Sequence, residues 1–246
     1  MNDLPLVEIF SSIQGEGPWV GVRQIFIRLF GCDVFCAYCD TPHETAPAHC
    51  VVTGIAGGTS RVPNPVPLEE ALAILQRYTG DYPGLHHSAS ITGGEPLLHA
   101  ETLRKWLPEI RTILPVYLET AGLHVEELRS VIGMTDFVSM DIKLPSVTGL
   151  SPQWDRHRAF LEVARSAETY VKIVVGAATP LAEIRAAASV VADCGGDVPL
   201  VIQPVTGSTG RPGVSPEALL RFQEAASSRV ADVRVIPQVH RFLDVL

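Results

Sequence analysis

The chain has 246 residues, of which 46% are hydrophobic and 19% are charged. This composition supports a large buried core and excludes disorder of the kind that comes from low hydrophobicity and high charge. The formal net charge of −8 argues against broad binding of nucleic acid or of an anionic membrane surface. One α/β domain can reach this length, and we expect a single domain over residues 1–246.

The first residues, MNDLPLVEIFSSIQGEG, lack a basic stretch followed by an apolar one, and no later window holds 18 uncharged apolar residues. We therefore expect a soluble, cytoplasmic protein that enters no membrane. The five cysteines are too few and too unevenly spaced for a secreted disulfide scaffold. Three of them fall between residues 32 and 39, and in a reducing compartment this clustering points to metal.

Residues 24–30 (QIFIRLF) alternate β-branched, aromatic and polar side chains and predict a strand. The strand leads through Gly31 into the cysteine segment, so Cys32 is expected just beyond the C-terminal end of a strand. Residues 41–67 are rich in Pro, Gly and Thr and have no sustained period. They predict a long loop with at most one short strand or turn.

From residue 68 onward, helix-like and strand-like runs alternate. The predicted helices are 68–78, 100–113, 124–133, 180–195 and 215–228, and the further predicted strands are 88–94, 115–120, 136–143, 169–175, 199–205 and 231–238. Strict alternation implies right-handed crossovers and a parallel sheet. The expected fold is an α/β partial (β/α) barrel with parallel strands, outer helices and a site at the strand C-termini.

Cys32, Cys36 and Cys39 form a C-x3-C-x2-C triplet in one short segment. Three thiolates can bind three corners of a cubic iron–sulfur cluster and leave the fourth iron open to a substrate or cofactor. The alternatives are a zinc site completed by Cys50 or a nearby histidine, and buried thiols without metal. Zinc knuckles and ribbons favour pairs of C-x2-C, so the triplet favours the cluster.

Gly93, Gly94 and Glu95 stand at the end of a predicted strand. Two glycines there let the backbone approach a ligand closely and offer free N–H groups, while Glu95 can accept a hydrogen bond from an ammonium group. A tight turn between strand and loop is the alternative for the glycines.

Gln14, Glu16 and Arg28 suit a polar heterocycle that carries a carboxylate. An amide and a carboxylate can pair with ring N–H and carbonyl groups, and a guanidinium can bind an acid through two hydrogen bonds. A surface turn and an outward-facing strand residue are the alternatives here. Lys172 is a polar residue in the buried-looking strand 169–175, so it either points to the site or pairs with an acid.

The cysteine triplet, Tyr38 before its last cysteine, and Gly93-Gly94-Glu95-Pro96 resemble the radical SAM superfamily. Within it, the chain is similar to the 7-carboxy-7-deazaguanine synthase family. The similarity spans almost the whole chain, through Glu8-Ile9-Phe10, Gln14-Gly15-Glu16-Gly17, Phe26-Ile27-Arg28, Gly31-Cys32, Cys39-Asp40-Thr41, Thr92 to Pro96, Glu119-Thr120, Gln203-Pro204 and Pro237 to His240.

This resemblance implies a [4Fe–4S] cluster on the three cysteines, with S-adenosyl-L-methionine (SAM) bound to the open iron and to nearby residues. Asp141 departs from the serine that several family members carry, and Lys143 could instead be a solvated strand end. The implied SAM-binding residues are Tyr38, Asp40, Gly94, Glu95, Asp141, Ile142, Lys143, Gln203, Pro204, Val205 and Thr206.

The resemblance also implies 6-carboxy-5,6,7,8-tetrahydropterin as the substrate and Thr41 as a ligand of Mg²⁺, a cation that usually keeps several waters. The alternatives are an ordinary loop threonine and, at Leu246, a frayed terminus instead of a carboxylate turned to the substrate. The implied substrate-binding residues are Ile13, Gln14, Gly15, Glu16, Arg28, Thr92, His240 and Leu246.

The implied activity is that of a radical SAM carbon–nitrogen lyase. A 5′-deoxyadenosyl radical takes hydrogen from C6 of the pterin, the ring contracts, and loss of ammonia gives 7-carboxy-7-deazaguanine for queuosine, a tRNA modification, and other deazapurines. An external electron donor such as flavodoxin or ferredoxin, and a homodimer, are further family expectations. Another radical SAM enzyme, such as a glycyl-radical activase, and a non-catalytic metal-binding protein are the alternatives. Cys50 and Cys194 receive no role.

Overall fold

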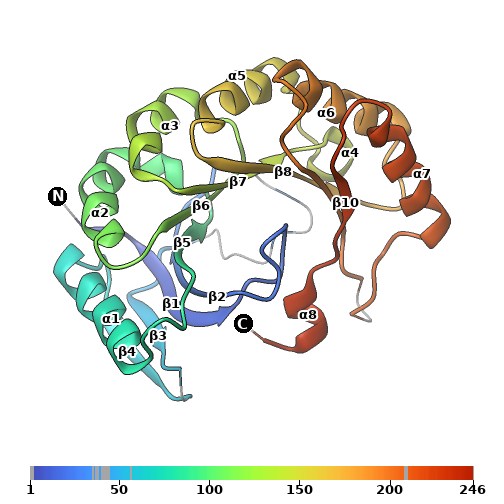
Figure 1. The fold of residues 1–246 in the computed structure, drawn as a ribbon. Helices are drawn as coiled ribbons and strands as arrows, with labels where there is room; N and C mark the ends of the chain where they lie inside the picture. Colours follow the sequence, from blue (N-terminus) through green and yellow to red (C-terminus); the bar gives the residue numbers. More distant parts are fainter. Residues whose placement is uncertain are drawn as a thin grey trace.

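A curved sheet with helices on its outer face organises the molecule (Figure 1). The structure is a computed structural model that describes residues 3–34, 36, 39, 45–55, 57–207 and 210–245. Within these ranges, no helix has the length and apolar character needed to cross a membrane. The strands of the described ranges form one ten-stranded sheet in the order β10-β9-β8-β7-β6-β5-β2-β1-β3-β4.

Seven strands that follow one another in the sheet are parallel to one another and correspond to the seven strands predicted from the sequence. The residues of β2 and of β5 to β9 are mostly buried, as expected for a parallel sheet covered by helices, whereas in β10 only Val233 is buried. The seven strands are β2 (Arg23–Leu29), β5 (Ser88–Gly93), β6 (Val116–Thr120), β7 (Phe137–Ile142), β8 (Glu168–Val175), β9 (Leu200–Pro204) and β10 (Val233–Val235).

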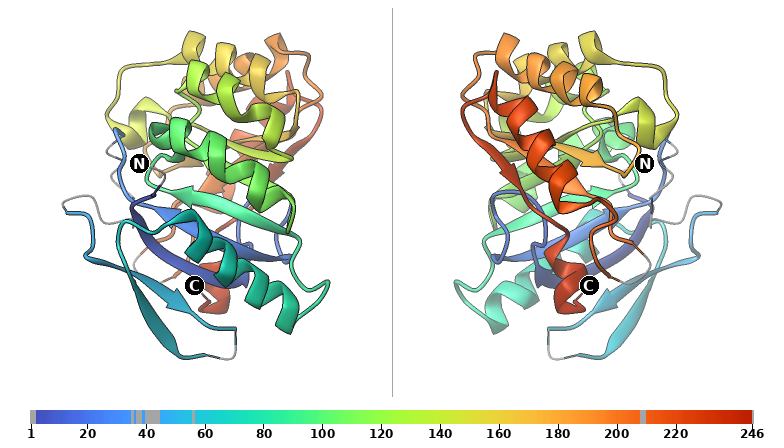
Figure 2. Two further views of the ribbon diagram at one scale, coloured as in Figure 1. Left: turned by 90° about the vertical axis from the view of Figure 1, so that its left-hand side faces the viewer. Right: turned by 90° about the vertical axis from the view of Figure 1, so that its right-hand side faces the viewer.

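The five predicted helices are present on the outer side of the sheet, where Figures 1 and 2 show them side by side. Their apolar faces bury residues such as Leu103 and Trp106 of α2 against the sheet. The five helices are α1 (Leu68–Asp81), α2 (Ala100–Arg111), α3 (Val125–Val131), α6 (Leu181–Asp193) and α7 (Pro216–Ser227).

The crossover between β7 and β8 contains two helices that the sequence analysis missed, α4 (Pro145–Thr148) and α5 (Trp154–Ala164). In α5 the residues His157, Phe160, Leu161 and Ala164 are buried, at the i, i+3, i+4, i+7 spacing of one helix face. A parallel connection requires a long crossover, so a helix was required between these two strands.

The predicted α/β fold with parallel strands and outer helices is confirmed, but the sheet is mixed at its N-terminal side. The strand β1 (Leu6–Ile13) runs antiparallel to β2, and β3 (His49–Thr53) pairs parallel with β1. The expected long loop at 41–67 was wrong for residues 49–63, because β3 and β4 (Thr59–Pro63) form an antiparallel hairpin. The buried side chains of Cys50 and Val52 alternate with more exposed neighbours, a period of two that the surrounding Pro and Gly residues obscure.

The loop between β1 and β2, residues 14–22, lies near the N-terminal ends of β6, β7 and β8. Its Trp19 packs against Tyr117, Phe137 and Tyr170, with ring centroids 5.1–5.8 Å apart. On the open side of the arc, α8 (Val239–Leu243) lies close to this loop (Figure 1), and the N–H of Val239 donates to the carbonyl of Gly15 at 2.9 Å. The loop and the C-terminal segment are therefore in direct contact on the open side of the arc.

Candidate active site

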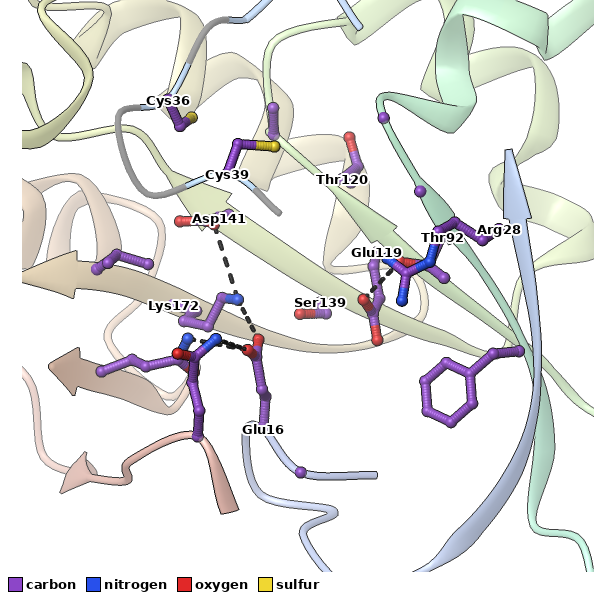
Figure 3. A pocket seen from close by; sticks show the side chains of 18 of the residues that line it. Glu16, Arg28, Cys36, Cys39, Thr92, Glu119, Thr120, Ser139, Asp141 and Lys172 are labelled. Atoms are coloured by element: carbon purple, nitrogen blue, oxygen red, sulfur yellow. Dashed lines mark hydrogen bonds and ion pairs between the residues drawn. The ribbon is translucent and has the colours of Figure 1, made fainter. Parts of the chain in front are cut away.

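A cavity of about 210 Å³ lies inside the arc. Its walls come from β1, β2 and β5–β9, from the β1–β2 loop and from the residues around α8. In Figure 3, Cys36 and Cys39 lie at one end of the cavity and Glu16 at the other, with Asp141 and Lys172 between them. The cavity thus joins the predicted cluster to the predicted substrate residues.

The cysteine end is built where β2 ends. All three cysteines of the triplet line the cavity, and the N–H of Cys39 donates to the carbonyl of Cys36 at 3.1 Å. Burial raises the pKa of the Cys32 thiol to about 11. Cys32 and Cys36 pack beside Val34, Ala121 and Leu123, so an apolar wall supports this segment. Among the described residues, no three His, Cys, Asp or Glu side chains converge as ligands of a single metal ion.

Gly93 and Gly94 pack against the start of the cysteine segment, and the N–H of Gly94 is not free, which corrects the sequence-based expectation for this residue. The N–H of Gly94 donates to Leu29 at 3.1 Å, and the N–H of Glu95 donates to Gly31 at 2.7 Å. A Cβ atom at position 93 or 94 would overlap the carbonyl oxygen of Leu29 or Gly31. Only glycines allow β5 to pass so close to the end of β2.

Glu95 is fully buried and does not line the cavity. Its carboxylate accepts hydrogen bonds from Thr120 Oγ1 at 2.9 Å, from the N–H of Ala121 at 2.7 Å and from the N–H of Leu97 at 2.9 Å. Burial raises the pKa of Glu95 despite these bonds. The carboxylate anchors the turn after β6, and its predicted contact with SAM stays a prediction.

Glu16 is the centre of a network that joins the β1–β2 loop to three other segments. Its Oε2 accepts from Lys172 of β8, and its Oε1 accepts from Gln203 of β9 at 3.0 Å and from Gln238 at 2.9 Å. Burial alone would raise the pKa of Glu16, but the Lys172 ammonium and the hydrogen bonds of Lys172 and Gln238 outweigh it and lower the pKa to about 2. Glu16 is therefore ionised.

Lys172 both lines the cavity and pairs with acids, which combines the two expectations for this residue. Besides Glu16, it lies 3.8 Å from Asp141 Oδ2, and that oxygen accepts from Lys143 Nζ at 2.8 Å. Although burial opposes the charged form, the neighbouring carboxylates raise the pKa of both lysines. Positive and negative groups alternate along the inner wall from Glu16 towards the cysteines (Figure 3).

Gln14 is buried, and its side chain is occupied by protein groups. Its Nε2 donates to Gln24 Oε1 at 2.9 Å and to Glu119 Oε1 at 3.0 Å, and its Oε1 accepts from the N–H of Glu16 at 2.9 Å. Thr92 Oγ1 donates to Glu119 Oε2 at 2.7 Å. Gln14 and Thr92 therefore both orient the carboxylate of Glu119 in the cavity wall.

Arg28 lines the cavity opposite the Glu16–Lys172 pair. Its Nε donates to Glu8 Oε1 at 2.7 Å, and its guanidinium carbon lies 5.8 Å from the ring centroid of Phe10, which stacks on Phe26 at 5.0 Å. Figure 3 shows the guanidinium directed towards Glu119. One edge of the guanidinium is thus fixed by Glu8, and an aromatic wall lies beside it.

The structure brings most of the predicted site residues to this one cavity. Those that line it are Cys32, Cys36, Cys39, Ile13, Gln14, Gly15, Glu16, Arg28, Thr92, Gly94, Asp141, Lys143, Gln203 and His240. Those that do not line it are Glu95, Ile142, Pro204, Val205 and Thr206. Tyr38, Asp40, Thr41 and Leu246 lie outside the described residues.

Several cavity residues were not assigned to the site from the sequence: Phe10, Phe26, Glu119, Ser139 and Gln238. Glu119 and Ser139 stand in buried strands, where a polar residue that faces the inside of the arc needs a partner. That signal was available in the strands 115–120 and 136–143. The role of Gln238 depends on where the C-terminal segment folds, which no local pattern gives.

Comparisons with known proteins agree with this geometry. A model of the radical SAM superfamily matches residues 26–175. A 7-carboxy-7-deazaguanine synthase of Geobacter sulfurreducens is 46% identical over 98% of this chain and 97% of its own length. One from Methanothermobacter thermautotrophicus is 35% identical over 97% of this chain and 96% of its own length.

Solved structures show the same fold. The crystal structure of QueE from Escherichia coli gives a TM-score of 0.58 at 22% identity and covers 97% of this chain and 95% of its own. A radical SAM methyltransferase from Sphaerobacter thermophilus also gives 0.58, at 15% identity, over 88% of this chain and 66% of its own. Because the superfamily model matches residues 26–175, more than half of the chain, the chain is a radical SAM enzyme. Its relatives place it more narrowly, since at this identity and coverage it belongs to the 7-carboxy-7-deazaguanine synthase family.

Proposed function

We propose that this chain converts 6-carboxy-5,6,7,8-tetrahydropterin to 7-carboxy-7-deazaguanine in queuosine and deazapurine biosynthesis. The observation that carries the proposal is a small cavity with cysteines at one end, Glu16 at the other and a polar group of Arg28, Thr92 and Glu119 in its wall. The β1–β2 loop closes the arc near the N-terminal ends of β6 and β7, where Trp19 packs against Tyr117 and Phe137. A glycyl-radical activase must admit a polypeptide, and a cavity of about 210 Å³ instead suits a small molecule.

The residues at the middle of the cavity fit SAM. Asp141 Oδ1 and Gln203 Oε1 are buried and have no hydrogen-bond partner among the described residues. Buried acceptors without a partner are costly, so a ligand that donates hydrogen bonds is expected there. SAM carries such donors in its ammonium and ribose hydroxyl groups.

The cysteine triplet fits a cubic cluster better than a single ion, because each cysteine of a cluster binds a different iron. Cys50, the residue considered for a zinc site, is fully buried in β3 and its thiol lies 3.7 Å from the carbonyl of Val51. When bound, the cluster and SAM supply the 5′-deoxyadenosyl radical that begins the reaction. The raised pKa of Cys32 means that iron must displace a proton from this thiol.

The chain's own residues bind and orient the substrate. Arg28 and Glu119 both line the cavity, which supports a role for Arg28 in binding the pterin carboxylate and for Glu119 in accepting from a ring N–H or amino group. Gln14 and Thr92 fix the Glu119 carboxylate. The stacked pair Phe10 and Phe26 keeps water from one side of the cavity.

The remaining expectations belong to the same proposal. Mg²⁺ at Thr41, an external electron donor, a homodimer and a cytoplasmic location are predictions from the family resemblance. The membership of every described strand in one sheet supports a single domain over residues 1–246.

Anaerobic reconstitution with iron and sulfide tests the proposal. We expect a brown chromophore, cleavage of SAM under a chemical reductant, and 7-carboxy-7-deazaguanine when the carboxytetrahydropterin is added. Cleavage of SAM without this product would contradict the proposed synthase function and favour that of a glycyl-radical activase. If neither the chromophore nor SAM cleavage is observed, both enzymatic functions are contradicted, and a non-catalytic metal-binding protein is the remaining interpretation.

Replacement of Arg28 tests the substrate assignment. Arg28→Gln should weaken pterin binding by about 10- to 100-fold, because a charge-assisted hydrogen-bonded pair contributes about 1.5–3 kcal/mol. SAM affinity should be unchanged. Arg234→Gln removes an arginine from a surface ion pair with Asp232 and serves as the matched control. A smaller loss than threefold for Arg28→Gln would show that the carboxylate binds elsewhere.

A further inference from the structure

Two acceptor oxygens in the cavity have no partner within the described part of the chain, Asp141 Oδ1 and Gln203 Oε1. Both residues are more than nine-tenths buried, since their exposed fractions are 8% and 2%. The other polar atom of each side chain is bound by a neighbour. The direction in which the two oxygens point is therefore decided by those neighbours.

Glu16 fixes the orientation of the Gln203 amide. Gln203 Nε2 donates to Glu16 Oε1 at 3.0 Å. An ionised carboxylate can only accept hydrogen bonds, so the NH2 group of Gln203 must face it and the carbonyl oxygen must face away. The pKa of Glu16, lowered to about 2 by Lys172 and Gln238 against the effect of burial, keeps this carboxylate charged.

Lysines fix the carboxylate of Asp141 in the same way. Lys143 Nζ donates to Asp141 Oδ2 at 2.8 Å, and Lys172 Nζ lies 3.8 Å from the same oxygen. With Oδ2 taken by two cations, Oδ1 is the oxygen left for a ligand. Lys172 also pairs with Glu16, so a single ion pair connects both free acceptors.

We propose that the Glu16–Lys172 ion pair is a positioning device for SAM, which sets the Gln203 amide and the Asp141 carboxylate so that one acceptor of each faces the cofactor. The inference rests on the radical SAM function proposed above. It differs from the sequence-based prediction for Glu16, in which this carboxylate binds the pterin. In the structure both of its oxygens already accept from protein donors.

Glu16→Gln is the sharpest variant, because it changes hydrogen-bonding capacity without changing size. The single amide oxygen of the new side chain would be drawn to Lys172, so its NH2 group would face Gln203. The Gln203 amide must then turn over and place its own NH2 group in the cavity. The affinity of the cluster-loaded enzyme for SAM, measured anaerobically without reductant, should fall at least about tenfold, the loss expected for an unpaired donor.

The same substitution in a Gln203→Ala background separates positioning from general damage. If Glu16 acts on SAM through Gln203, Glu16→Gln should change SAM affinity by less than twofold once the amide is gone. Glu126→Gln is the matched control, because it also removes an ion pair, with Arg129, but on the surface of α3 and away from the cavity. It should leave SAM affinity unchanged.

Asp141→Asn tests the second acceptor without touching Glu16, and it keeps the proposal testable if Glu16→Gln does not fold. Lys143 and Lys172 would hold the amide oxygen, so the NH2 group would replace Oδ1 in the cavity. SAM affinity should again fall at least about tenfold.

Three outcomes would overturn the inference: an unchanged SAM affinity in Glu16→Gln with weakened pterin binding, equal losses of SAM affinity with and without the Gln203 amide, or normal SAM affinity in Asp141→Asn. None of these measurements requires product formation. A chain that binds SAM in the expected pattern but makes no 7-carboxy-7-deazaguanine would refute the proposed function and leave this inference standing.

Discussion

The four residues from Gln14 to Gly17 each contact a different part of the molecule. Gln14 holds Glu119, and Glu16 holds Lys172 and the two glutamines. A Cβ at Gly15 would overlap the ring and backbone of His240, and a Cβ at Gly17 would overlap the hydroxyl end of Tyr170. The motif is therefore a close-packed junction and not a surface turn.

Gly17→Ala should destabilise the protein. The residue has φ +69°, where an L side chain is strained by about 1–2 kcal/mol. Tyr170 cannot retreat, because it is 1% exposed and its hydroxyl accepts from Ser139 at 2.7 Å. With overpacking added at about 1–3 kcal/mol, we expect the free energy of unfolding to fall by about 2–5 kcal/mol in denaturant titrations.

Gly80→Ala is the control for this change. Gly80 lies in α1, and a Cβ there would meet no atom within 4 Å. Alanine in a helix should leave stability unchanged or raise it by up to about 1 kcal/mol. A loss below about 0.5 kcal/mol for Gly17→Ala would show that the β1–β2 loop moves aside easily, and the junction would then not be rigid.

At this scale the sequence revealed which residue types gather at the site but not what each side chain contacts. Arg28 and the cysteines were predicted and line the cavity. Gln14 was expected to pair with a ligand, yet its amide is used by Gln24 and Glu119. A glutamine offers donors and acceptors to whichever partner is nearest, and the partner is set by strands far apart in the chain.

The element α5 carries a buried histidine that links two strand ends. His157 is fully buried; its Nδ1 lies 3.0 Å from the carbonyl of Gly122, and its Nε2 accepts from the N–H of Lys143 at 3.2 Å. Burial lowers its pKa from 6.5 to about 4. The ring is thus neutral and joins α5 to the turn after β6 and to the end of β7.

This histidine predicts a loss of stability on acidification. Because the unfolded chain binds a proton below pH 6.5 and the folded chain only below about 4, unfolding takes up a proton between these values. The stabilisation is complete above pH 6.5 and declines as the pH falls towards 4. Between pH 7.5 and 5.5 we expect His157 to account for a loss of about 1 kcal/mol in the free energy of unfolding.

His157→Asn should remove this contribution to the pH dependence of the free energy of unfolding, whatever the substitution does to stability at pH 7.5. The measurement is the difference in free energy of unfolding between the two pH values, compared with the wild type. His49→Asn replaces an exposed histidine and is the matched control. An unchanged pH dependence in His157→Asn would assign the acid sensitivity to other groups.

Elements were predicted from the sequence where burial imposes a clear period. The parallel strands are near-continuous apolar runs, and the five predicted helices have amphipathic patterns of ten residues or more. The helix α5 was missed because its buried face begins with the polar residue His157, which lies among the charged residues Asp155, Arg156 and Arg158 in the sequence. The strands β1, β3 and β4 lie where the sheet leaves the βα pattern, so no rule of alternation places them.

The molecule as a whole is an arc whose opening is covered by a short C-terminal segment. Gln238 contacts Glu16 and Thr206, and Val239 contacts Gly15. No described residue of α8 is buried, so this helix adds little to the core. Its position suggests a different effect, since it separates the cavity from solvent beside Gln238 and His240.

A chain ending at Ile236 should therefore keep its fold and lose its substrate. We expect an unchanged far-UV circular dichroism spectrum and a Tm within a few degrees of the full chain, because the sheet and its outer helices are complete without residues 237–246. Pterin affinity should fall more than about 100-fold, since polar contacts and water exclusion are lost together. SAM affinity should fall less than about fivefold, because Lys172 and Gln203 still hold Glu16.

The contrast between the two ligands makes this deletion informative. Phe242→Ser, at a side chain that is 84% exposed on α8, is the control and should leave both affinities unchanged. Equal losses of pterin and SAM affinity would mean that the C-terminal segment supports the whole cavity. A pterin affinity within threefold of the full chain would mean that the arc binds its substrate without this cover, and the enclosure of the cavity would then have to come from the β1–β2 loop alone.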